Sequence, residues 1–447
     1  MRTIYWRRCS LSSIIFSILL TCIIFLTLLF YIKHIIIMSI IYNTSINDHD
    51  FKQNSLIQSS SIPPQYLLIP YREFVLRTSI SCHTFKLIEP KKNLFQFHPK
   101  YSPYLHGIFP FIIPYLNITF DDIENFYTKI LIKNQNQTDN IIHQTSFASN
   151  ITFKNIPYRY ENEMWYPIEV ISAQRTAILV PLQGRDYNAK VFLLNIHAFA
   201  RRQLLTYTII LIEQVKPSNS RFNKGRLYNA GVRYIEQQSL NITCLILHDV
   251  DLIPENDENL YTCELQHPKH TTIRIRQLNN TRNNYMRYYE FLIGGVLLLT
   301  FDMYKKINGF SNLYWGWGGE DDDLSLRFIQ QRMCVIRPKY ELAIYVALPH
   351  PKGQANGARF NLLTWSTIRL NADGYKQIDS MIHFVNIRKI STVTHLKIDV
   401  NADNSLYKPP LMKNFQSTYN TIYNNITTIG KTETTTTTST FLKTTSF

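Results

Sequence analysis

The sequence predicts an α/β fold in which a mostly parallel sheet is flanked by helices. Its 447 residues, 45% of them hydrophobic and 13% aromatic, are typical of a globular chain with a sizeable core. Between residues 176 and 251, short apolar runs alternate with segments of helical periodicity. Such alternation indicates strand–helix–strand units and a parallel sheet. Ligands of such sheets bind beyond the carboxyl ends of the strands, which directs attention to the segments that follow each apolar run.

Each element has its own signal. Three apolar runs predict strands: "TAILVP" at 176–181, "YTIILIE" at 207–213 and "TCLILHDVD" at 243–251. Apolar residues recur at helical spacing at 188–202 and 223–238, which predicts the two intervening helices. A turn-like "LQGRD" follows the first strand, and the third strand ends in two carboxylates.

The N-terminus predicts a membrane anchor. Residues 11–32 contain no charge, and about 20 apolar residues suffice to span a bilayer as a helix. Arg2, Arg7 and Arg8 precede the run, so the positive-inside rule keeps residues 1–10 cytosolic and translocates the rest. A cleaved signal peptide is the alternative, but no small-residue cleavage site follows the run. We therefore expect a transmembrane helix, a stem at 33–75, a region without clear periodicity at 76–166 and the α/β domain at 167–402.

Residues 403–447 end in a Thr-rich, low-complexity stretch that predicts a disordered tail. The net charge of +15 favours an anionic partner, namely nucleic acid, a membrane surface or a phosphorylated small molecule; the absence of a long Lys/Arg block argues against nucleic acid. Glycosylation sequons follow the anchor, which fits a lumenal body. Their asparagines are Asn43, Asn117, Asn136, Asn150, Asn241, Asn279 and Asn425. Four cysteines, Cys82, Cys244, Cys263 and Cys334, also lie beyond the anchor, and counting leaves their pairing open.

Asp249 and Asp251 are the first candidate site residues. If the strand continues to residue 251, its alternation places both carboxylates on one side and Val250 on the other. Two such carboxylates can hold a divalent cation whose other ligands are phosphate oxygens. Helix capping is the competing interpretation, because "DENLY" follows soon after.

The second candidate is "YWGWGGEDDD" at 314–323, in which tryptophans and glycines precede four acidic residues. Acidic residues are favoured at a helix N-terminus, which by itself accounts for one or two of them. A sugar ring can stack on an exposed indole, and a carboxylate beside that indole can then accept a proton from one of the sugar's hydroxyl groups. The third candidate is His350, in a Gly/Pro/Asn-rich loop after the apolar run "LAIYVAL"; it is a metal ligand or simply an exposed histidine.

In this order, these segments resemble the β-1,4-galactosyltransferase family of Golgi enzymes. The resemblance is carried by "FNKGRLYNAG", "DVDLIPENDENLYTC", "INGFSNLYWGWGGEDDDL" and "LNADGYKQI", and it covers about residues 176–400. It implies a nucleotide-sugar-binding sheet of the GT-A type, related to the Rossmann fold. It also implies Mn²⁺-dependent, inverting transfer from a UDP-sugar to a terminal GlcNAc-type acceptor by a single-pass type II Golgi membrane protein.

The resemblance also implies residue roles. Asp321 would be the catalytic base, and Glu320 would help to hold the acceptor. Asp251 and His350 would bind the metal, and Cys244 would pair with Cys263. The implied donor-site residues are Arg185, Phe222, Lys224, Asp249, Val250, Asp251, Leu292 and Trp317. The implied acceptor-site residues are Tyr289, Glu320, Asp321, Arg359, Phe360 and Leu363.

The chain departs from the family pattern at several positions. Ala347 stands where the family has a metal-binding Met, Gln183 stands where it has an Arg, and the loop before Arg359 is shorter. Leu292 replaces a Tyr that crowds the donor's C2 substituent, which favours UDP-GalNAc over UDP-Gal; plain core packing of Leu292 is the alternative. A non-catalytic glycan-binding descendant would explain Ala347 and Gln183, and a mucin-like adhesion protein would explain the Thr-rich tail. Retention of Asp251, Glu320 and Asp321 favours an active enzyme.

Overall fold

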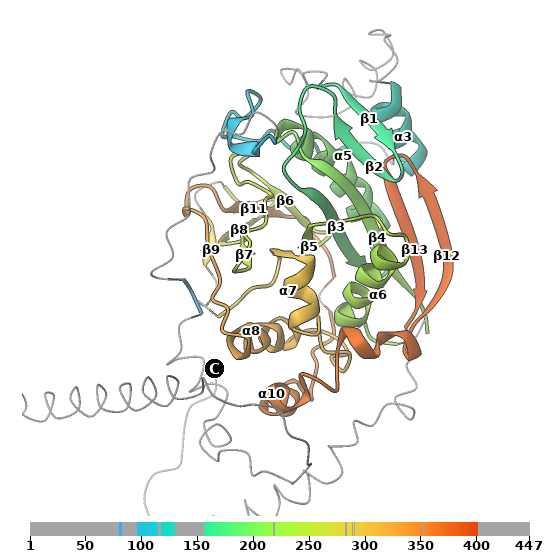
Figure 1. Cartoon of the computed structure of the whole chain (residues 1–447), viewed down its shortest axis with the longest axis vertical. Helices are drawn as coiled ribbons and strands as arrows, with labels where there is room; N and C mark the ends of the chain where they lie inside the picture. Colours follow the sequence, from blue (N-terminus) through green and yellow to red (C-terminus); the bar gives the residue numbers. More distant parts are fainter. Residues whose placement is uncertain are drawn as a thin grey trace, which may run out of the picture. The chain divides into compact units, whose positions relative to one another are not determined.

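The expected strands form the centre of a mixed sheet in the computed structural model of the chain (Figure 1). The structure describes residues 80–82, 96–114, 118–129, 156–217, 220–281, 284–287, 289, 291–351 and 353–400. In these ranges the sheet has nine strands in the order β1-β2-β4-β3-β5-β10-β7, with β13 beside β4 and β12 beside β13. The strands are β1 (Tyr158–Glu161), β2 (Met164–Pro167), β3 (Arg175–Leu182), β4 (Thr206–Lys216), β5 (Cys244–His248), β7 (Lys269–His270), β10 (Val296–Thr300), β12 (His383–Ile390) and β13 (Val393–Asp399).

Only the middle of this sheet is parallel. Strand β3 pairs in parallel with β4 and β5, and β13 pairs in parallel with β4. The β1–β2 and β12–β13 hairpins and strand β10 are antiparallel additions. The expectation of a mostly parallel sheet is therefore corrected to a mixed sheet. The physical reason is that an antiparallel neighbour needs no helical crossover, so hairpins and a returning strand can extend both flanks.

Helices cover both faces of the sheet. Alternate strand residues point to opposite faces. Ile178 and Val180 pack in one core with α5 (Asp186–Arg202), whereas Ala177 and Leu179 pack in another with α6 (Lys224–Gln237). The expected helices at 188–202 and 223–238 are thus confirmed within two residues at each end. Because both faces are covered, the central strands read as continuous apolar runs.

The other helical segments lie before and after this centre. They are the 3₁₀ helix η2 (Pro99–Tyr101), α3 (Phe120–Lys129), α7 (Phe301–Lys306), α8 (Glu320–Gln330), α9 (Arg359–Thr364), α10 (Ser366–Arg369) and the 3₁₀ helix η4 (Tyr375–Ser380). The sheet begins at Tyr158, before the expected domain boundary at 167. None of the helices in the described ranges has the length and apolar character of a bilayer-spanning segment. The expected anchor at 11–32, the stem at 33–75 and the tail at 403–447 lie outside those ranges.

A second, four-stranded sheet has the order β6-β11-β8-β9. Its strands are β6 (Leu252–Pro254), β8 (Arg274–Gln277), β9 (Met286–Arg287) and β11 (Ile344–Ala347). Strand β11 confirms the strand expected from the apolar run before His350. It pairs with β6, which follows Asp251. This pairing brings two segments about 100 residues apart to one place. Sequence periodicity did not predict this sheet, because its strands are short and lie far apart in the chain.

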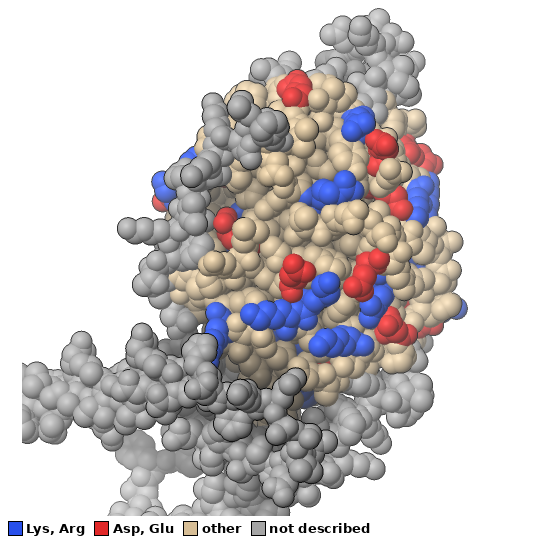
Figure 2. Space-filling model, in the orientation of Figure 1, with Lys and Arg blue, Asp and Glu red and all other residues tan. Residues whose placement is uncertain are grey.

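The charges of the described residues are interspersed on the face drawn in Figure 2, where Lys and Arg side chains alternate with Asp and Glu. The side chains of Asn241 and Asn279, two of the sequon asparagines, are exposed. The remaining sequon asparagines lie outside the described residues.

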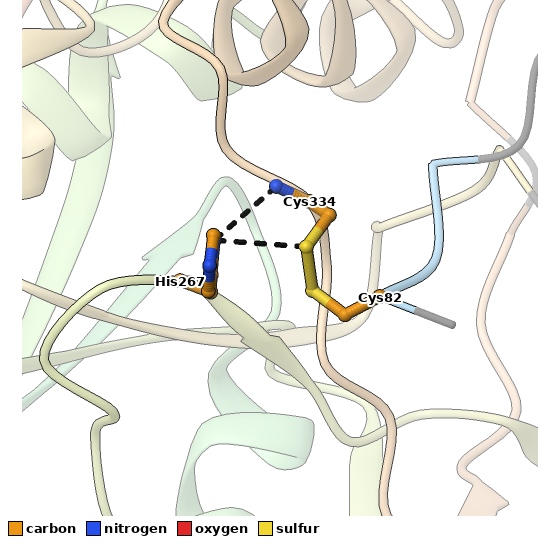
Figure 3. Close-up of side chains that lie close together, drawn as sticks. All are labelled: Cys82, His267 and Cys334. Atoms are coloured by element: carbon orange, nitrogen blue, oxygen red, sulfur yellow. Dashed lines mark hydrogen bonds between the residues drawn. A yellow bond between two sulfur atoms is a disulfide. The ribbon is translucent and has the colours of Figure 1, made fainter. Parts of the chain in front are cut away.

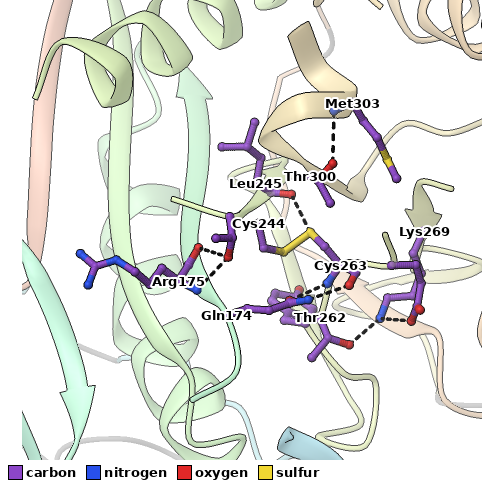
Figure 4. Close-up of a disulfide and its surroundings, with 12 residues drawn as sticks. Gln174, Arg175, Cys244, Leu245, Thr262, Cys263, Lys269, Thr300 and Met303 are labelled. Carbon is purple, nitrogen blue, oxygen red and sulfur yellow. Dashed lines mark hydrogen bonds and ion pairs between the residues drawn. A yellow bond between two sulfur atoms is a disulfide. The ribbon is translucent and has the colours of Figure 1, made fainter. Parts of the chain in front are cut away.

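Two disulfides fasten the described chain. Cys82 pairs with Cys334, a pairing that the sequence left open, and the ring of His267 lies beside it (Figure 3). The expected bond between Cys244 and Cys263 is confirmed (Figure 4). Gln174 clamps the second bond, because its side chain donates to the Cys263 carbonyl at 2.8 Å and accepts from the Cys263 N–H at 2.9 Å.

Candidate functional site

Lys224 is the centre of the candidate site. It is the first residue of α6, whose N-terminus is capped by the side chain of Asn223 accepting from the Arg226 N–H. The Lys224 ammonium lies 3.0 Å from Asp249, 3.3 Å from Asp321 and 4.0 Å from Glu320. The segment after β5 and the start of α8 thus direct three carboxylates at one cation.

Burial makes these charges depend strongly on one another. Burial lowers the pKa of Lys224, but attraction to Asp249 and Asp321 outweighs it, so the pKa stands well above its usual value. Burial raises the pKa of Asp249 to about 6 against the opposing effect of Lys224. Burial, followed by repulsion from Asp321, raises the pKa of Glu320 to about 8. The raised pKa of Glu320 favours its protonated form, which would give the cluster a hydrogen-bond donor among its acceptors.

One carboxylate oxygen of Glu320, the buried Oε2 atom, has no hydrogen-bond partner among the described residues. A buried polar oxygen without a partner is costly in a folded protein. That cost would fall if a hydroxyl group entered beside the partly exposed Asp321 carboxylate and bonded to Oε2.

Asp251 and His350 form a pair beside this cluster. The His350 Nε2 atom lies 3.0 Å from Asp251 Oδ2, and its Nδ1 atom lies 2.8 Å from the Pro351 carbonyl. A proton on Nδ1 would be donated to that carbonyl, which leaves the Nε2 lone pair facing the carboxylate. When Nε2 carries a proton instead, it donates to Asp251, and this hydrogen bond raises the pKa of His350. The space between the two side chains therefore favours a positive charge, either a proton or a metal ion.

A divalent metal fits this pair. Two adjacent ligands of an octahedral ion at roughly 2.1 Å lie about 3 Å apart, which matches the observed separation of the two ligating atoms. A carboxylate oxygen and an imidazole nitrogen suit Mn²⁺. The backbone holds the pair together, because the Leu348 N–H donates to the Asp251 carbonyl at 2.7 Å.

The strand-alternation argument for Asp249 and Asp251 was wrong in its geometry. Strand β5 ends at His248, and residues 249–251 form a turn in which the Leu252 N–H donates to the Asp249 carbonyl at 3.3 Å. The turn sends the two carboxylates to different partners, Lys224 and His350. Val250 is buried in the core, so its side chain lines no open pocket.

Gly294 and Leu292 line the cluster from β10's side. A Cβ atom on Gly294 would lie 2.3 Å from Asp321 Oδ2 and 3.6 Å from Leu292 Cδ1. The Asp321 carboxylate therefore rests against a backbone that only glycine leaves open. Leu292 is half-buried and belongs to neither hydrophobic core, unlike its neighbours Phe291 and Ile293. This placement argues against the core-packing interpretation of Leu292.

Trp317 forms an exposed wall with the segment after His350. Its side chain is 64% exposed. The backbone N–H of Trp317 donates to the Gln354 carbonyl at 2.8 Å, and the backbone carbonyl of Trp317 accepts from the Asn356 N–H at 2.8 Å. The guanidinium of Arg359 lies 5.7 Å from the Trp317 ring and 4.9 Å from the ring of Phe360, which is exposed. Aromatic faces and a guanidinium so arranged suit the apolar face and hydroxyl groups of a sugar.

The remaining expected site residues occupy several environments. Arg185 donates to the Pro351 carbonyl at 3.1 Å, beside His350. The Phe222 carbonyl accepts from the Gly316 N–H at 2.8 Å, and Tyr289 donates its hydroxyl hydrogen to Asp322 at 2.6 Å. Leu363 is the buried residue of α9, so it packs in the core and supports the wall rather than lining it.

Sequence reasoning missed a buried ionic network behind the acidic cluster. Asp323 is fully buried and pairs with Arg327 at 2.6 Å and with Arg369 at 2.9 Å. Tyr314 donates to Asp323 at 3.0 Å, and Asp373 completes the network through Arg369. The i,i+4 spacings of the Asp323–Arg327 and Arg369–Asp373 pairs were a signal that could have found it. The four acidic residues therefore divide their roles, and Asp323 anchors the other three.

Comparisons with known proteins match the segments from which this site is built. Residues 130–264 match the family profile described as the N-terminal region of glycosyl transferase group 7. Residues 274–351 match the profile described as the N-terminal domain of galactosyltransferase. Human beta-1,4-galactosyltransferase 4 is 42% identical over 221 residues, covering 47% of this chain and 61% of the relative. Over these residues the chain is similar to β-1,4-galactosyltransferases.

Further relatives extend the comparison. Human beta-1,4-galactosyltransferase 3 is 37% identical over 233 residues, covering 51% of this chain and 56% of the relative. The chain thus spans about three fifths of the length of the curated relatives it matches. Among solved structures, the catalytic domain of Drosophila beta1,4galactosyltransferase 7 with xylobiose has a TM-score of 0.45 and 24% identity, covering 52% of this chain and 97% of that one.

The positions at which this chain departs from the β-1,4-galactosyltransferase pattern lie at one edge of the site. Ala347, the last residue of β11, is buried and offers no ligand atom to a metal. Gln183 donates weakly to the Ser220 carbonyl at 3.4 Å. Among the described residues, Asp251 and His350 remain as a carboxylate and an imidazole close enough together to bind a metal at this position.

Proposed function

We propose that the chain transfers a sugar from a UDP-sugar to a hydroxyl group of an acceptor sugar, with inversion and with a divalent metal. The observation that carries the proposal is the convergence of Asp249, Glu320 and Asp321 on Lys224, next to the Asp251–His350 pair. One side of this arrangement suits a nucleotide diphosphate and its cation, and the other side suits a neutral sugar.

Asp251 and His350 would hold the metal, with Mn²⁺ as the expected ion. When bound, the metal neutralises the charge that develops on the departing diphosphate. Arg185, beside His350, and Lys224 are the basic side chains near that leaving group. Phe222 and Asp249 complete the proposed donor side.

Asp321 would be the general base. It contacts Lys224 through a charge pair, and its side chain remains partly open to solvent. The raised pKa of Glu320 favours its protonated form, and in that form it would donate a hydrogen bond to the acceptor. Asp321 would then take the proton from the attacking hydroxyl. Trp317, Tyr289, Arg359 and Phe360 would position the acceptor, for which a terminal GlcNAc is the proposed sugar.

For the donor we propose UDP-GalNAc. Leu292 lies beside Gly294 and Asp321 outside the core, and an aliphatic side chain there leaves room for an acetamido group. UDP-Gal is the second candidate, and the names of the curated relatives favour it. A lumenal catalytic domain on a type II Golgi membrane protein would fit the apolar run at 11–32.

The test is transfer by the purified chain onto a GlcNAc-terminated acceptor, with UDP-GalNAc and UDP-Gal in parallel and with Mn²⁺ or a chelator. Metal-dependent product supports the enzyme, and Leu292→Tyr should shift the preference toward UDP-Gal. An unchanged donor ratio in Leu292→Tyr would remove the argument from Leu292. No product from either donor, with the chain folded, would favour the non-catalytic glycan-binding protein.

Binding of the metal can be tested without turnover. Mn²⁺ should raise the melting temperature of the wild-type chain, because a ligand that binds only the folded state stabilises it. His350→Ala should lose most of that increase. An equal increase in His350→Ala would exclude His350 as a ligand.

A further inference from the structure

The segment from Cys334 to Arg337 is held between two other segments of the chain. On one side, the Val335 N–H donates to the Ile80 carbonyl at 2.8 Å, and the Cys82 N–H donates to the Val335 carbonyl at 3.1 Å. On the other side, the Ile336 N–H donates to the Pro268 carbonyl at 2.8 Å. Residues 80–82 are thus the outermost piece of an arrangement that continues through β7 into the main sheet.

Arg337 connects this arrangement to the proposed donor site. Its Nη1 atom donates to Ser81 Oγ at 2.6 Å, and its Nη2 atom donates to the Leu292 carbonyl at 3.0 Å. The carbonyl of Gly294, two residues after Leu292, lies 2.8 Å from His270 Nε2. The backbone is therefore held on both sides of Ile293, next to the Asp321 carboxylate.

A covalent bond keeps Ser81 in reach of Arg337. In addition to the backbone hydrogen bonds and the buried side chain of Ile80, the Cys82–Cys334 disulfide links residues 80–82 to a segment 252 positions away in the sequence. The Cys334 N–H donates to His267 Nδ1 at 3.3 Å (Figure 3). The three side chains also lie close enough to share a metal ion, but sulfurs bonded to each other are not thiolate ligands.

We propose that Arg337 is a positioning residue for the donor sugar, and that the Cys82–Cys334 disulfide maintains it by holding Ser81 against its guanidinium. The fork of the guanidinium is suited to this task, because it donates to two fixed acceptors at once. Through the Leu292 carbonyl it sets where the Leu292 side chain stands beside Gly294 and Asp321. The inference rests on the proposed function, since that function assigns Leu292 to the donor site.

The test compares the wild-type chain with Ser81→Ala, Arg337→Gln, Arg337→Lys and the double variant Cys82→Ser/Cys334→Ser. Ser391→Ala is the matched control, because it also loses one hydroxyl hydrogen bond, to Glu124 at 2.8 Å, in the turn between β12 and β13. For each variant we would measure kcat and KM for both UDP-sugars. We would also measure amide hydrogen exchange of residues 291–296 with no ligand present.

We expect the KM for the donor to rise about fivefold in Ser81→Ala, which corresponds to one net hydrogen bond, with kcat unchanged. Arg337→Gln should raise it further and alter the ratio between the two donors. Arg337→Lys should fall between wild type and Arg337→Gln, because a lysine reaches one acceptor and not both. The double cysteine variant should resemble Ser81→Ala, exchange at 291–296 should quicken in all four, and Ser391→Ala should match wild type.

Unchanged exchange at 291–296 in Arg337→Gln would overturn the proposal even if the wild-type chain transfers no sugar, so its failure is separable from failure of the proposed function. If the wild type is active, an equal loss of kcat with both donors and an unchanged donor KM would also overturn it, because that pattern indicates general destabilisation.

Discussion

Replacing Lys224 with methionine tests the electrostatic account of the site most directly. The substitution keeps the length and the apolar stem of the side chain but removes the charge that lies 3.0 Å from Asp249 and 3.3 Å from Asp321. Three carboxylates would then face one another without a cation. Removing one partner of a buried ion pair costs about 3–5 kcal/mol, and the partial exposure of the Asp249 side chain (30%) places this site near 3 kcal/mol.

The loss of stability in Lys224→Met should become smaller as the pH falls. The pKa of Asp249 is raised to about 6 and that of Glu320 to about 8, and without Lys224 both would rise further. As the pH falls through these values the carboxylates take up protons and their repulsion disappears. The destabilisation of Lys224→Met should therefore be full at about pH 9 and small at about pH 5.

The assay is urea unfolding of wild type and Lys224→Met across this pH range. Lys190→Met is the matched control, because Lys190 pairs with a largely exposed Asp186 at 2.6 Å and its loss should cost under about 1 kcal/mol at any pH. Transfer by Lys224→Met should fall roughly 100-fold, since Asp321 would lose the cation that lies 3.3 Å from its carboxylate and helps to hold it in place. Equal stability of Lys224→Met and wild type at high pH would refute the reasoning, and so would a penalty that does not shrink on acidification.

Three other substitutions separate the parts of the site. Gly294→Ala would push the Asp321 carboxylate away from a Cβ at 2.3 Å, and we expect kcat to fall about 100-fold; Gly357→Ala, which meets no atom within 4 Å, should leave kcat unchanged in the same assay. Glu320→Gln should flatten the dependence of stability on pH. The Glu320 carboxyl has a folded pKa of about 8 against an ordinary value of 4.5, so the wild type should lose stability as the pH rises between those values. Urea midpoints that fall equally with pH in both proteins would contradict this. Asp323→Asn should cost about 3–5 kcal/mol by leaving two buried guanidinium groups short of a partner, and a thermal melt that matches wild type would disprove the anchoring role.

Much of the local structure could be predicted from the sequence. Strands β3, β4 and β5 and helices α5 and α6 have unbroken apolar runs or a clear helical period, and each lies within a few residues of its expected place. The start of α8 at Glu320 followed from the run of acidic residues. These predictions succeed because the burial of a helix face or of a strand between two helix layers leaves its period in the local sequence.

The site itself was predicted as a set of residue types, and its geometry was not. Lys224 and Asp321 are separated by 97 positions, and nothing local to either residue indicates that the lysine would stand among three carboxylates. The resemblance assigned Lys224 to the nucleotide, whereas in the structure it also joins the donor-side Asp249 to Asp321 and Glu320. Pairing across such a distance depends on which strands are neighbours, which is a property of the whole sheet.

By itself, then, the sequence determined the apolar strands, the two helices that cover them and the presence of carboxylates and a histidine beyond the strand ends. Only the tertiary structure decided that β10 returns antiparallel beside β5, that Cys82 meets Cys334 and that Asp323 turns inward while Asp321 faces Gly294. The reason is physical: periodicity records whether a residue is buried, but it does not record the partner against which it is buried. Partners far apart in the chain are chosen by the register of strands and by the packing of helices on them.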